Sequence, residues 1–420
     1  MATDGTNWAG NVTFSAARLH RPSSVDELRA AIAGARHVRA LGTGHSFNRI
    51  ADTPYDLVTV ARLPRVAELD RARSTVRVSA GTRYGELAPY LHRHGYALHN
   101  LGSLPHISIA GAVATGTHGS GDRNGNLATA VRGIELVTAD GDLVTVDPAE
   151  LPGSVVSLGA LGVVTALDLD VVPTFDVRQH VYEHLPRAAL EEHFDEVFGA
   201  AYSVSLFTRW RGPDIEQVWL KQRADAEPLG ADLFGARPAD GARHPIVTMS
   251  PLHCTAQQGV PGPWHERLPH FRLDFTPSAG DELQSEYFVP RSRALEAFAA
   301  LDEIADRIAL VVQVSEVRSI AADELWLSPA QGRDSIAFHF TWIADEAAVA
   351  PVVAAVEDRL VPLGARPHWG KVFGIDPDLV RAQYPRLAAF AALATRLDPA
   401  AKFRNRFLDR YLPPAAPPAR

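Results

Sequence analysis

The stretch LGSLPHISIAGAVATGTHGSG, residues 101–121, decides how the rest of the chain is interpreted. Five of its 21 residues are glycine, five more are serine or threonine, and none is Asp, Glu, Lys or Arg. Because Gly, Ser and Thr disfavour helix interiors and bulky side chains are few, we expect neither an ordinary helix nor a well-packed strand. Small residues let backbone N–H groups approach a ligand closely and form concave anion sites. The stretch therefore predicts a site for a pyrophosphate-bearing cofactor, with a glycine-rich surface loop as the alternative.

Length, charge and cysteine content limit the class of protein. A chain of 420 residues predicts two domains, and its 46% hydrophobic and 21% charged residues are typical of a soluble globular protein. The formal net charge of −8 and the absence of a basic run argue against a nucleic-acid partner. No signal peptide and no apolar run of membrane-spanning length is present, so we expect a cytoplasmic protein with no membrane partner. The single cysteine, Cys254, excludes an intrachain disulfide and a cysteine-based zinc site.

A helix, a strand and a glycine turn are predicted near the N-terminus. Residues 24–27 have capping-box spacing, and the apolar positions that follow share one face of a short helix. Residues 37–41, HVRAL, alternate like a strand and run directly into GTGHSF, residues 42–47. This turn lacks the GxGxxG fingerprint, because Phe47 replaces the third glycine and no helix pattern follows. The pattern indicates an α/β unit but argues against a Rossmann cofactor fold.

His45 lies inside this turn, where three roles have to be weighed. A lone histidine beside glycines is often only a turn residue with a satisfied ring. A metal ligand would need partners, and no second histidine or carboxylate lies at ligand spacing nearby. An imidazole nitrogen can also attack an electrophilic carbon and form a covalent bond.

Further elements are predicted on both sides of the glycine-rich stretch. A strand that contains Val76 and a helix that ends at Gly95 precede it. Residues 134–146, IELVTADGDLVTV, predict a hairpin with its turn at the Asp-Gly pair. Residues 157–172, SLGALGVVTALDLDVV, predict a second glycine turn followed by an alternating strand.

In combination, these motifs resemble the FAD-binding domain of the vanillyl-alcohol-oxidase superfamily. The similarity extends from NWAGN, residues 7–11, to LDPAAKF, residues 397–403. Within the superfamily the chain most resembles the alditol oxidases of the xylitol or sorbitol oxidase type, followed by the aldonolactone oxidoreductases. The resemblance implies an α+β fold, in which a PCMH-type FAD-binding domain of two α+β subdomains is joined to an α+β substrate-binding cap domain with an antiparallel sheet.

The composition changes near residue 175, where glycine-rich turns give way to strands and helices with aromatic residues. With the resemblance, this predicts an FAD-binding domain at 1–175, a cap domain at 176–365, a segment at 366–412 that returns to the FAD domain, and a disordered Pro-rich tail at 413–420. Residues 224–269 are rich in Pro and Gly and predict long loops. The motif WHERLPH, which begins in this segment, is not a zinc motif, because its second histidine comes one residue too late for HExxH and Pro269 disrupts the helix.

The resemblance also implies where FAD binds and how it is attached. His45 matches the histidine that binds the flavin covalently, and we expect a single link because Cys254 lies outside the FAD domain. The predicted cofactor residues wrap the cofactor (Leu41, Gly42, Thr43, Gly44, His45, Ser46 and Phe47), adjoin the flavin (Ser103), line the phosphates and ribityl chain (Ser108, Gly111, Thr115, Gly116, Thr117 and His118) or meet the adenine (Val164).

Two strand patterns in the cap domain combine apolar and polar faces. In VVQVSEVRS, period-two alternation places Val312, Val314, Glu316 and Arg318 on one face. The charged pair belongs either to a solvated salt bridge or to a cavity wall, and the pattern alone does not decide between them. Residues 335–343, SIAFHFTWI, have one strongly apolar face and one more polar face, which is typical of a sheet that packs on helices and covers a ligand.

The family pattern favours the cavity. In alditol oxidases the substrate site uses a Glu and an Arg two residues apart, a His on the next strand, a more distant Lys and a Ser beside the flavin. The matching residues here are Ser103, Glu316, Arg318, His339 and Lys371. We expect all five to bind substrate, and Arg318, Lys371 and His339 to act in catalysis, with His339 as a candidate proton acceptor.

The resulting hypothesis is an oxidase that converts the terminal primary alcohol of an acyclic polyol, xylitol or sorbitol, to the aldehyde. Hydride transfer from C1 to flavin N5 would be followed by reduction of O2 to hydrogen peroxide, and Gly102 would leave room for O2 beside the flavin. The small polyol and O2 are the expected partners of a monomer. The alternatives are an aldonolactone oxidase or dehydrogenase of the gulono- or galactonolactone type, and a catalytically silent FAD- or sugar-binding protein. The silent protein would be expected to lack His45, Arg318 or Lys371, and none is lost.

Overall fold

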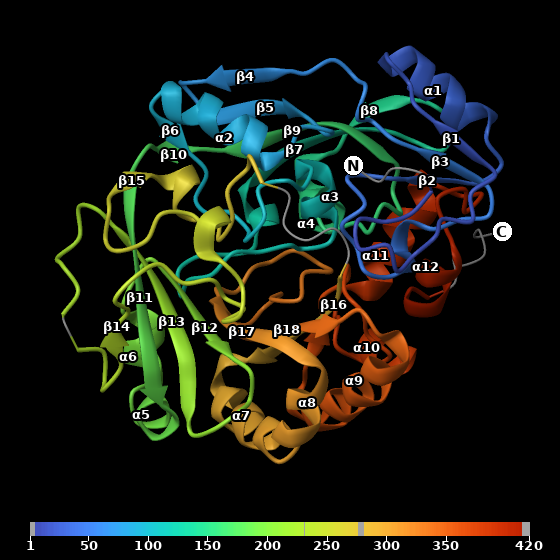
Figure 1. Cartoon of the computed structure of the whole chain (residues 1–420). Helices are drawn as coiled ribbons and strands as arrows, with labels where there is room; N and C mark the ends of the chain where they lie inside the picture. The colour runs from blue at the N-terminus through green and yellow to red at the C-terminus, as the bar shows by residue number, and fades with distance from the viewer. Residues whose placement is uncertain (1–4, 231, 276–280, 414–420) are drawn as a thin grey trace.

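The computed structural model describes residues 5–230, 232–275 and 281–413. The N-terminal part of the chain forms two main sheets, which Figure 1 shows at the top and right. A small parallel sheet has the order β1-β3-β2, and a larger antiparallel sheet has the order β4-β5-β9-β7-β8. The strands are β1 Arg18–His20, β2 Val38–Ala40, β3 Asp56–Val58, β4 Ala67–Asp70, β5 Thr75–Ser79, β7 Val131–Val137, β8 Leu143–Thr145 and β9 Val163–Asp170. The helices are α1 Val25–Gly34, α2 Tyr84–Arg93, α3 Ile109–Ala114 and α4 Leu151–Ser154. A short pair, β6 Tyr96–Ala97 and β10 Val172–Pro173, forms a third sheet.

Local sequence signals place several of these elements correctly. The Ser24 side chain accepts a hydrogen bond from the Glu27 backbone N–H at the start of α1, and Leu28 and Ile32 bury the apolar face of the helix. The predicted hairpin forms from β7 and β8, and Gly141 in its turn has a φ of +84°. These predictions are confirmed because capping, amphipathic spacing and turn chemistry are local properties.

The expectation that residues 101–121 contain no helix is wrong for six residues, which form helix α3. Ile109, Ala112 and Val113 on this helix are buried in the main hydrophobic core. Burial of this face outweighs the low helix propensity of the surrounding glycines, serines and threonines. The glycine-rich segments before and after α3 are loops, as expected.

A nine-stranded sheet, here called the cap sheet, forms most of the second half of the molecule. Its strand order is β14-β11-β13-β12-β17-β18-β16-β19, and β15 pairs with β11. The strands are β11 Asp176–Pro186, β12 Ser203–Thr208, β13 Asp214–Arg223, β14 Arg237–Pro238, β15 Gly262–Pro263, β16 Glu282–Pro290, β17 Val312–Ile320, β18 Ser335–Ile343 and β19 Arg366–Pro367. The helices here are α5 Arg187–Glu192, α6 Phe194–Gly199, α7 Ala294–Asp302, α8 Ala305–Val311 and α9 Glu346–Leu360. Figure 1 shows α7, α8 and α9 on the side of the cap sheet that faces away from the N-terminal sheets.

One helical segment in this half is interrupted, and one predicted strand face needs correction. Residues 292–309 form the end of a short 3-10 turn and two helices, α7 and α8, because Ile304 leaves the helical conformation (φ −119°, ψ 16°) and buries its side chain. In β17, the register shifts between Val312 and Val314, so Val312 packs in the main core rather than beside Glu316. Long-range packing sets both irregularities, and local periodicity does not report it.

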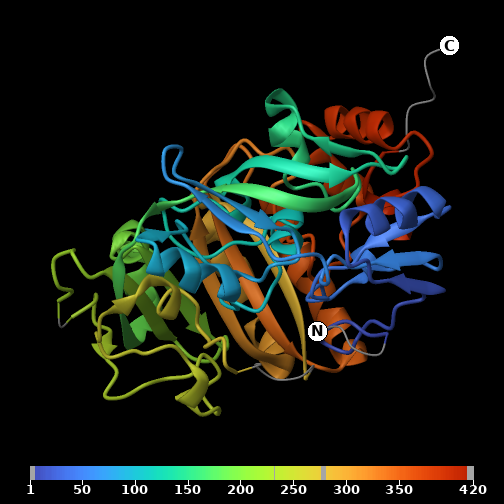
Figure 2. The same ribbon diagram turned by 90° about the horizontal axis from the view of Figure 1, so that it is seen from above.

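Helices α11 Leu387–Leu397 and α12 Arg406–Tyr411 lie near the N-terminal parallel sheet in Figure 1, whereas α10 Pro377–Ala382 lies next to α9. Figure 2 shows the C-terminal helices from above. The Val38 N–H donates to the carbonyl of Lys402 at 3.0 Å, and Phe403 is fully buried in a cluster with Leu28 and Ile32. The domain boundaries remain a prediction, and most of the predicted tail, residues 414–420, lies outside the described residues.

The glycine-rich stretch connects the two halves of the molecule. The Gly121 N–H donates to the carbonyl of Ser319 on β17 at 2.9 Å, and the Ser120 hydroxyl donates to the carbonyl of Val204 on β12. Residues 101–121 therefore lie between the N-terminal sheets and the cap sheet. Within the described part of the chain, no helix has the length and apolar character needed to cross a bilayer.

Candidate active site

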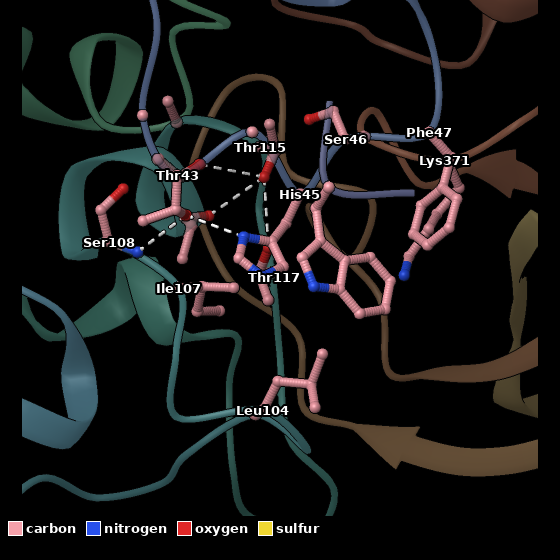
Figure 3. A pocket seen from close by; sticks show the side chains of 18 of the residues that line it. Thr43, His45, Ser46, Phe47, Leu104, Ile107, Ser108, Thr115, Thr117 and Lys371 are labelled. Atoms are coloured by element: carbon pink, nitrogen blue, oxygen red, sulfur yellow. Dashed lines mark hydrogen bonds between the residues drawn. The ribbon is translucent and has the colours of Figure 1, made fainter. Parts of the chain in front are cut away.

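One cavity lies between the glycine-rich turns and the cap sheet. Residues from 39–51, 102–118 and 157–164 line one part of it, and β16, β17, β18 and Lys371 line another part. Figure 3 shows Thr43, His45, Ser108 and Lys371 around this cavity. The turns approach it with backbone and small side chains, whereas the cap sheet contributes long polar side chains.

The predicted cofactor residues meet at this cavity with one exception. Those on its wall are Leu41, Gly42, Thr43, Gly44, His45, Ser46, Phe47, Ser103, Ser108, Gly111, Thr115, Thr117, His118 and Val164. Gly116 is not on the wall; it has a φ of +67°, and an added Cβ would lie 3.0 Å from Pro329. Its glycine permits a left-handed turn packed against Pro329, so its prediction as a lining residue does not agree with the structure.

Three residues form a cradle that only small side chains permit. A Cβ added to Gly42 or to Gly111 would lie 2.8 Å from the Ser108 hydroxyl oxygen. That hydroxyl is buried and has no hydrogen-bond partner among the residues that the structure describes. A buried hydroxyl without a partner costs free energy, so this position fits a ligand with hydrogen-bonding oxygen atoms.

His45 sits in an apolar setting beside this cradle. Its Nδ1 lies 2.9 Å from the Thr43 hydroxyl oxygen, and its ring stacks on Trp8 with 5.3 Å between centroids (Figure 3 shows Thr43 and His45). Burial lowers the pKa of His45 to about 3, so the imidazole is neutral near pH 7. A neutral imidazole retains a lone pair on one ring nitrogen, which a nucleophilic role requires.

All five predicted substrate residues line the same cavity: Ser103, Glu316, Arg318, His339 and Lys371. Glu316 and Arg318 are only 5% and 6% exposed, which excludes the solvated surface pair. His339 on β18 is the cross-strand neighbour of Glu316 on β17. The polar row predicted from alternation is therefore a buried wall.

The Arg318 charge and hydrogen-bond donors around the carboxylates keep Glu316 and Arg318 ionised despite burial. Burial alone raises the pKa of Glu316, but Arg318 and His270 outweigh it and hold that pKa well below its usual range. Burial likewise lowers the pKa of Arg318, and the carboxylates of Glu316 and Glu286 more than reverse this effect. Burial lowers the pKa of Lys371 to about 8 and also lowers the pKa of His339.

Glu286 on β16 is a site residue that sequence reasoning missed. It accepts a hydrogen bond from Arg318 at 2.5 Å, and its carboxylate lies 3.1 Å from His118 Nε2 and 3.6 Å from His339 Nδ1. Arg318, His118 and His339 outweigh burial and hold the pKa of Glu286 well below its usual value. Strand alternation could have indicated Glu286, because in ELQSEYFVP, residues 282–290, the positions 282, 284 and 286 are polar and share one face.

Three further polar residues near the substrate wall were also missed. Gln284 accepts a hydrogen bond from the Lys371 ammonium, and Thr341 lies 3.2 Å from His339 Nε2. His270 lies 2.8 Å from Glu316. His270 follows the predicted loop region, residues 224–269, directly and belongs to no periodic pattern, so only the folded chain shows its place.

Cys254 lies outside this cavity wall. It is buried in an apolar cluster with Trp219 and Phe207, and burial raises the pKa of its thiol to about 12. A buried, protonated thiol is a poor nucleophile. In the motif WHERLPH, His265 lies in a 3-10 turn, Trp264–Glu266, and not in a zinc-binding helix.

Comparison with known proteins defines the class of protein first. Residues 16–147 match the family model of an FAD binding domain, and residues 281–411 match the model named D-arabinono-1,4-lactone oxidase. Among solved structures, cholesterol oxidase from B. sterolicum has a TM-score of 0.77 at 15% identity, covering 97% of this chain and 96% of that one. Glucooligosaccharide oxidase from Acremonium strictum has a TM-score of 0.72 at 16% identity, covering 98% and 95%. The fold and the cavity therefore define an FAD-binding oxidoreductase, and the predicted fold class is confirmed.

Sequence relatives then give the family. Alditol oxidase from Streptomyces sp. is 54% identical over 98% of this chain and 100% of its own length. L-gulono-1,4-lactone dehydrogenase from Mycobacterium tuberculosis is 31% identical over 99% of this chain and 100% of its own length. The chain belongs to the family of FAD-dependent oxidoreductases that contains these two enzymes.

The residues that line the cavity fit FAD. The glycine cradle around Ser108, the backbone of residues 41–47 and the turn at residues 157–164 offer the close backbone approach that a pyrophosphate requires. Lys371 lies 4.9 Å from the centre of the Phe47 ring, so the substrate wall and the cofactor wall meet at this point (Figure 3).

Proposed function

We propose that this protein oxidises the terminal primary alcohol of an acyclic polyol, such as xylitol or sorbitol, to the aldehyde, with O2 as electron acceptor. The observation that carries the proposal is the polar wall formed at the cofactor cavity by buried Glu316, Arg318 and His339 and half-buried Ser103 and Lys371. A polyol presents several hydroxyls, and each one left unpaired on burial costs about 1–3 kcal/mol, so it requires such a wall. The similarity to alditol oxidase supports the same substrate class.

When bound, FAD would supply the redox chemistry, namely hydride acceptance from the alcohol carbon and two-electron reduction of O2 to hydrogen peroxide. We propose that a single covalent bond to His45 attaches it. The neutral imidazole and its stacking on Trp8 support this attachment. The structural neighbour from Acremonium strictum is described as carrying a 6-S-cysteinyl, 8α-N1-histidyl FAD. Here Cys254 is off the cavity wall, which supports a histidyl link alone.

Two cations of this chain stabilise the alkoxide that forms as the hydroxyl loses its proton. Arg318 is held in place by Glu286, and Lys371 by Gln284, so both are positioned before substrate arrives. A preorganised donor in a site that excludes water contributes about 3–4 kcal/mol to transition-state stabilisation. Burial keeps His339 neutral, so its imidazole has the capacity to accept the hydroxyl proton.

A second candidate function is oxidation of an aldonolactone. Residues 281–411 match the model named for D-arabinono-1,4-lactone oxidase, and a lactone dehydrogenase is among the relatives. The higher identity to alditol oxidase favours the polyol. We further propose that the enzyme is a cytoplasmic monomer, which size-exclusion chromatography with light scattering and cell fractionation would test.

The testing experiment measures cofactor attachment and peroxide release. Acid precipitation of the purified protein should leave the yellow flavin in the pellet, and His45→Ala should release it to the supernatant. Peroxide release should follow addition of xylitol or sorbitol and exceed that with gulono- or galactonolactone. Turnover of lactones alone would transfer the assignment to the second candidate, and a colourless protein that takes up no FAD would contradict the proposal.

A further inference from the structure

A buried chain of polar groups runs from the substrate wall into the cap sheet. Lys221 on β13 is 1% exposed; its ammonium donates to the carbonyl of Leu268 and lies 2.9 Å from His270 Nδ1. On the other side of the ring, His270 Nε2 lies 2.8 Å from Glu316 Oε1. Glu316 and His270 line the cavity, whereas Lys221 lies behind them.

The donor and acceptor types in this chain determine the position of the His270 proton. An ammonium has three N–H donors and no acceptor, so His270 Nδ1 has to accept from Lys221. Burial lowers the pKa of His270 to about 4, so the ring is neutral near pH 7 and carries one proton. That proton is then on Nε2, from which it is donated to the Glu316 carboxylate.

His270 also contacts the opposite wall of the cavity. Its backbone N–H donates to the carbonyl of Ser103 at 3.1 Å, and its own carbonyl accepts from the Thr255 N–H at 2.9 Å. One residue of the long cap loop therefore touches a substrate residue from each half of the molecule, Ser103 and Glu316.

The choice of lysine at position 221 is unusual for this chain. Only Lys221, Lys371 and Lys402 are lysines among its 41 lysine and arginine residues. Arginine presents a rigid, planar fork of donors, whereas lysine is a compact charge on a flexible stem. A single buried ring nitrogen and one carbonyl suit the compact donor.

We propose that Lys221 and His270 are positioning residues for substrate: Lys221 fixes the Nε2–H tautomer of His270, which holds Glu316 as an acceptor for a polyol hydroxyl. This inference rests on the proposed polyol oxidation. Glu316 Oε1 is occupied by His270, and its Oε2 lies 3.7 Å from Arg318 Nε and is the oxygen left for substrate. Loss of the hydrogen bonds from Lys221 to His270 and from His270 to Glu316 should weaken polyol binding and leave the chemical step nearly unchanged.

Substitutions at His270 separate the hydrogen bond from the ring. His270→Gln keeps an N–H donor near the Nε2 position, whereas His270→Leu removes it. We expect His270→Leu to raise KM for xylitol about tenfold, the typical cost of one buried hydrogen bond to a charged group, and His270→Gln to raise it less than about threefold. In both variants kcat should stay within about threefold of wild type.

Lys221→Met tests whether the lysine acts through the histidine tautomer. We expect it to raise KM about fivefold in the wild-type background and less than about twofold in the His270→Gln background, since the amide does not need the lysine to present its N–H. Equal effects in both backgrounds would overturn the proposal. Lys402→Met is the matched control, because Lys402 and the carbonyl groups of Ile32 and Ala139 to which it donates are not part of the substrate wall, and it should not change KM.

The pH dependence of KM gives a second kinetic readout. The charged or titratable groups that face Lys221 and Glu316 are Arg318, Lys371, His270, His339 and the Cys254 thiol. Burial lowers the pKa of Lys221 to about 7, so above that pH the ammonium loses its charge and its hydrogen bond to His270 Nδ1 weakens. We therefore expect KM for xylitol to rise above about pH 7 in wild type, and to rise less in Lys221→Met, which has no ammonium to lose.

A substrate-free measurement separates this inference from the proposed function. Long-range ¹H–¹⁵N spectra of the FAD-loaded protein at pH 6, with the His270 signal assigned from its loss in His270→Gln, report which ring nitrogen carries the proton. An Nε2–H tautomer in wild type supports the inference, and an Nδ1–H tautomer overturns it, even if Lys221→Met does not fold. Wild-type protein that turns over no polyol would overturn the proposed function instead, while the tautomer still tests the Lys221–His270 pair.

Discussion

The two walls of the cavity are built in different ways. The cofactor wall consists of contiguous motifs, such as residues 41–47, whose backbone and small side chains face the ligand. Apart from Ser103, the substrate wall consists of single side chains from β16, β17, β18 and the segment after β19, which lie far apart in the chain. A backbone wall is specified locally and recognises a fixed group, whereas a side-chain wall is assembled by the sheet register and can be changed one residue at a time.

The largest effect on the substrate wall should come from Lys371→Met. Loss of the ammonium removes a stabiliser of the developing alkoxide, so the rate of flavin reduction by xylitol should fall about 100-fold or more. Stopped-flow absorbance in the absence of oxygen measures this rate. Reduction at nearly wild-type speed would show that the side-chain wall does not contribute to the chemical step.

Glu286→Gln tests the residue that joins the two walls, since Glu286 contacts His118 from the glycine-rich stretch and Arg318 and His339 from the cap sheet. Removing one charge of a buried network destabilises a protein by about 3–5 kcal/mol. We expect the free energy of unfolding to fall by up to this amount and kcat/KM for xylitol to fall about tenfold. Thermal unfolding and steady-state kinetics measure the two effects. A variant with wild-type values for both would show that Glu286 does not couple the two walls.

Gly102→Val tests the cofactor wall. A Cβ at Gly102 would meet the His118 carbonyl oxygen at 3.5 Å and Thr117 Cγ2 at 3.9 Å, which are ordinary van der Waals contacts. If O2 uses the space beside Gly102, reoxidation should slow roughly tenfold while reduction by xylitol changes little. Separate half-reactions in the stopped-flow instrument distinguish the two, and equal slowing of both would contradict this use of the space.

The smallest expected effect is a pH dependence. Burial lowers the pKa of Lys371 to about 8, so its stabilising charge is present below that pH and is lost as the pH rises through it. The rate of flavin reduction should decline above about pH 8 in wild type, and this decline should be absent in Lys371→Met. A profile of the reductive half-reaction from pH 6 to about pH 10 checks it.

Sequence patterns predicted the cofactor wall well and the substrate wall in part. Residues 41–47 and Ser108 were assigned from the family resemblance, and the small residues in these local runs are compatible with the close backbone approach of a cofactor. For Glu316, Arg318 and His339, strand alternation showed which residues share a face, and the family pattern favoured a cavity wall over a solvated salt bridge. Glu286 shows the same alternation but was missed because no family pattern pointed to its strand, and His270 was missed because a loop has no period.

By itself, the sequence determined the strands, the capped and amphipathic helices, the glycine turns and the residue types available for chemistry, because these depend on neighbours along the chain. Only the tertiary structure decided that residues 109–114 form a helix, that Glu316 and Arg318 are buried rather than solvated, and that Lys221, His270 and Glu286 adjoin them. Sheet register and burial bring together residues that are more than a hundred positions apart, such as His118 and Glu286, and the local sequence does not show such contacts.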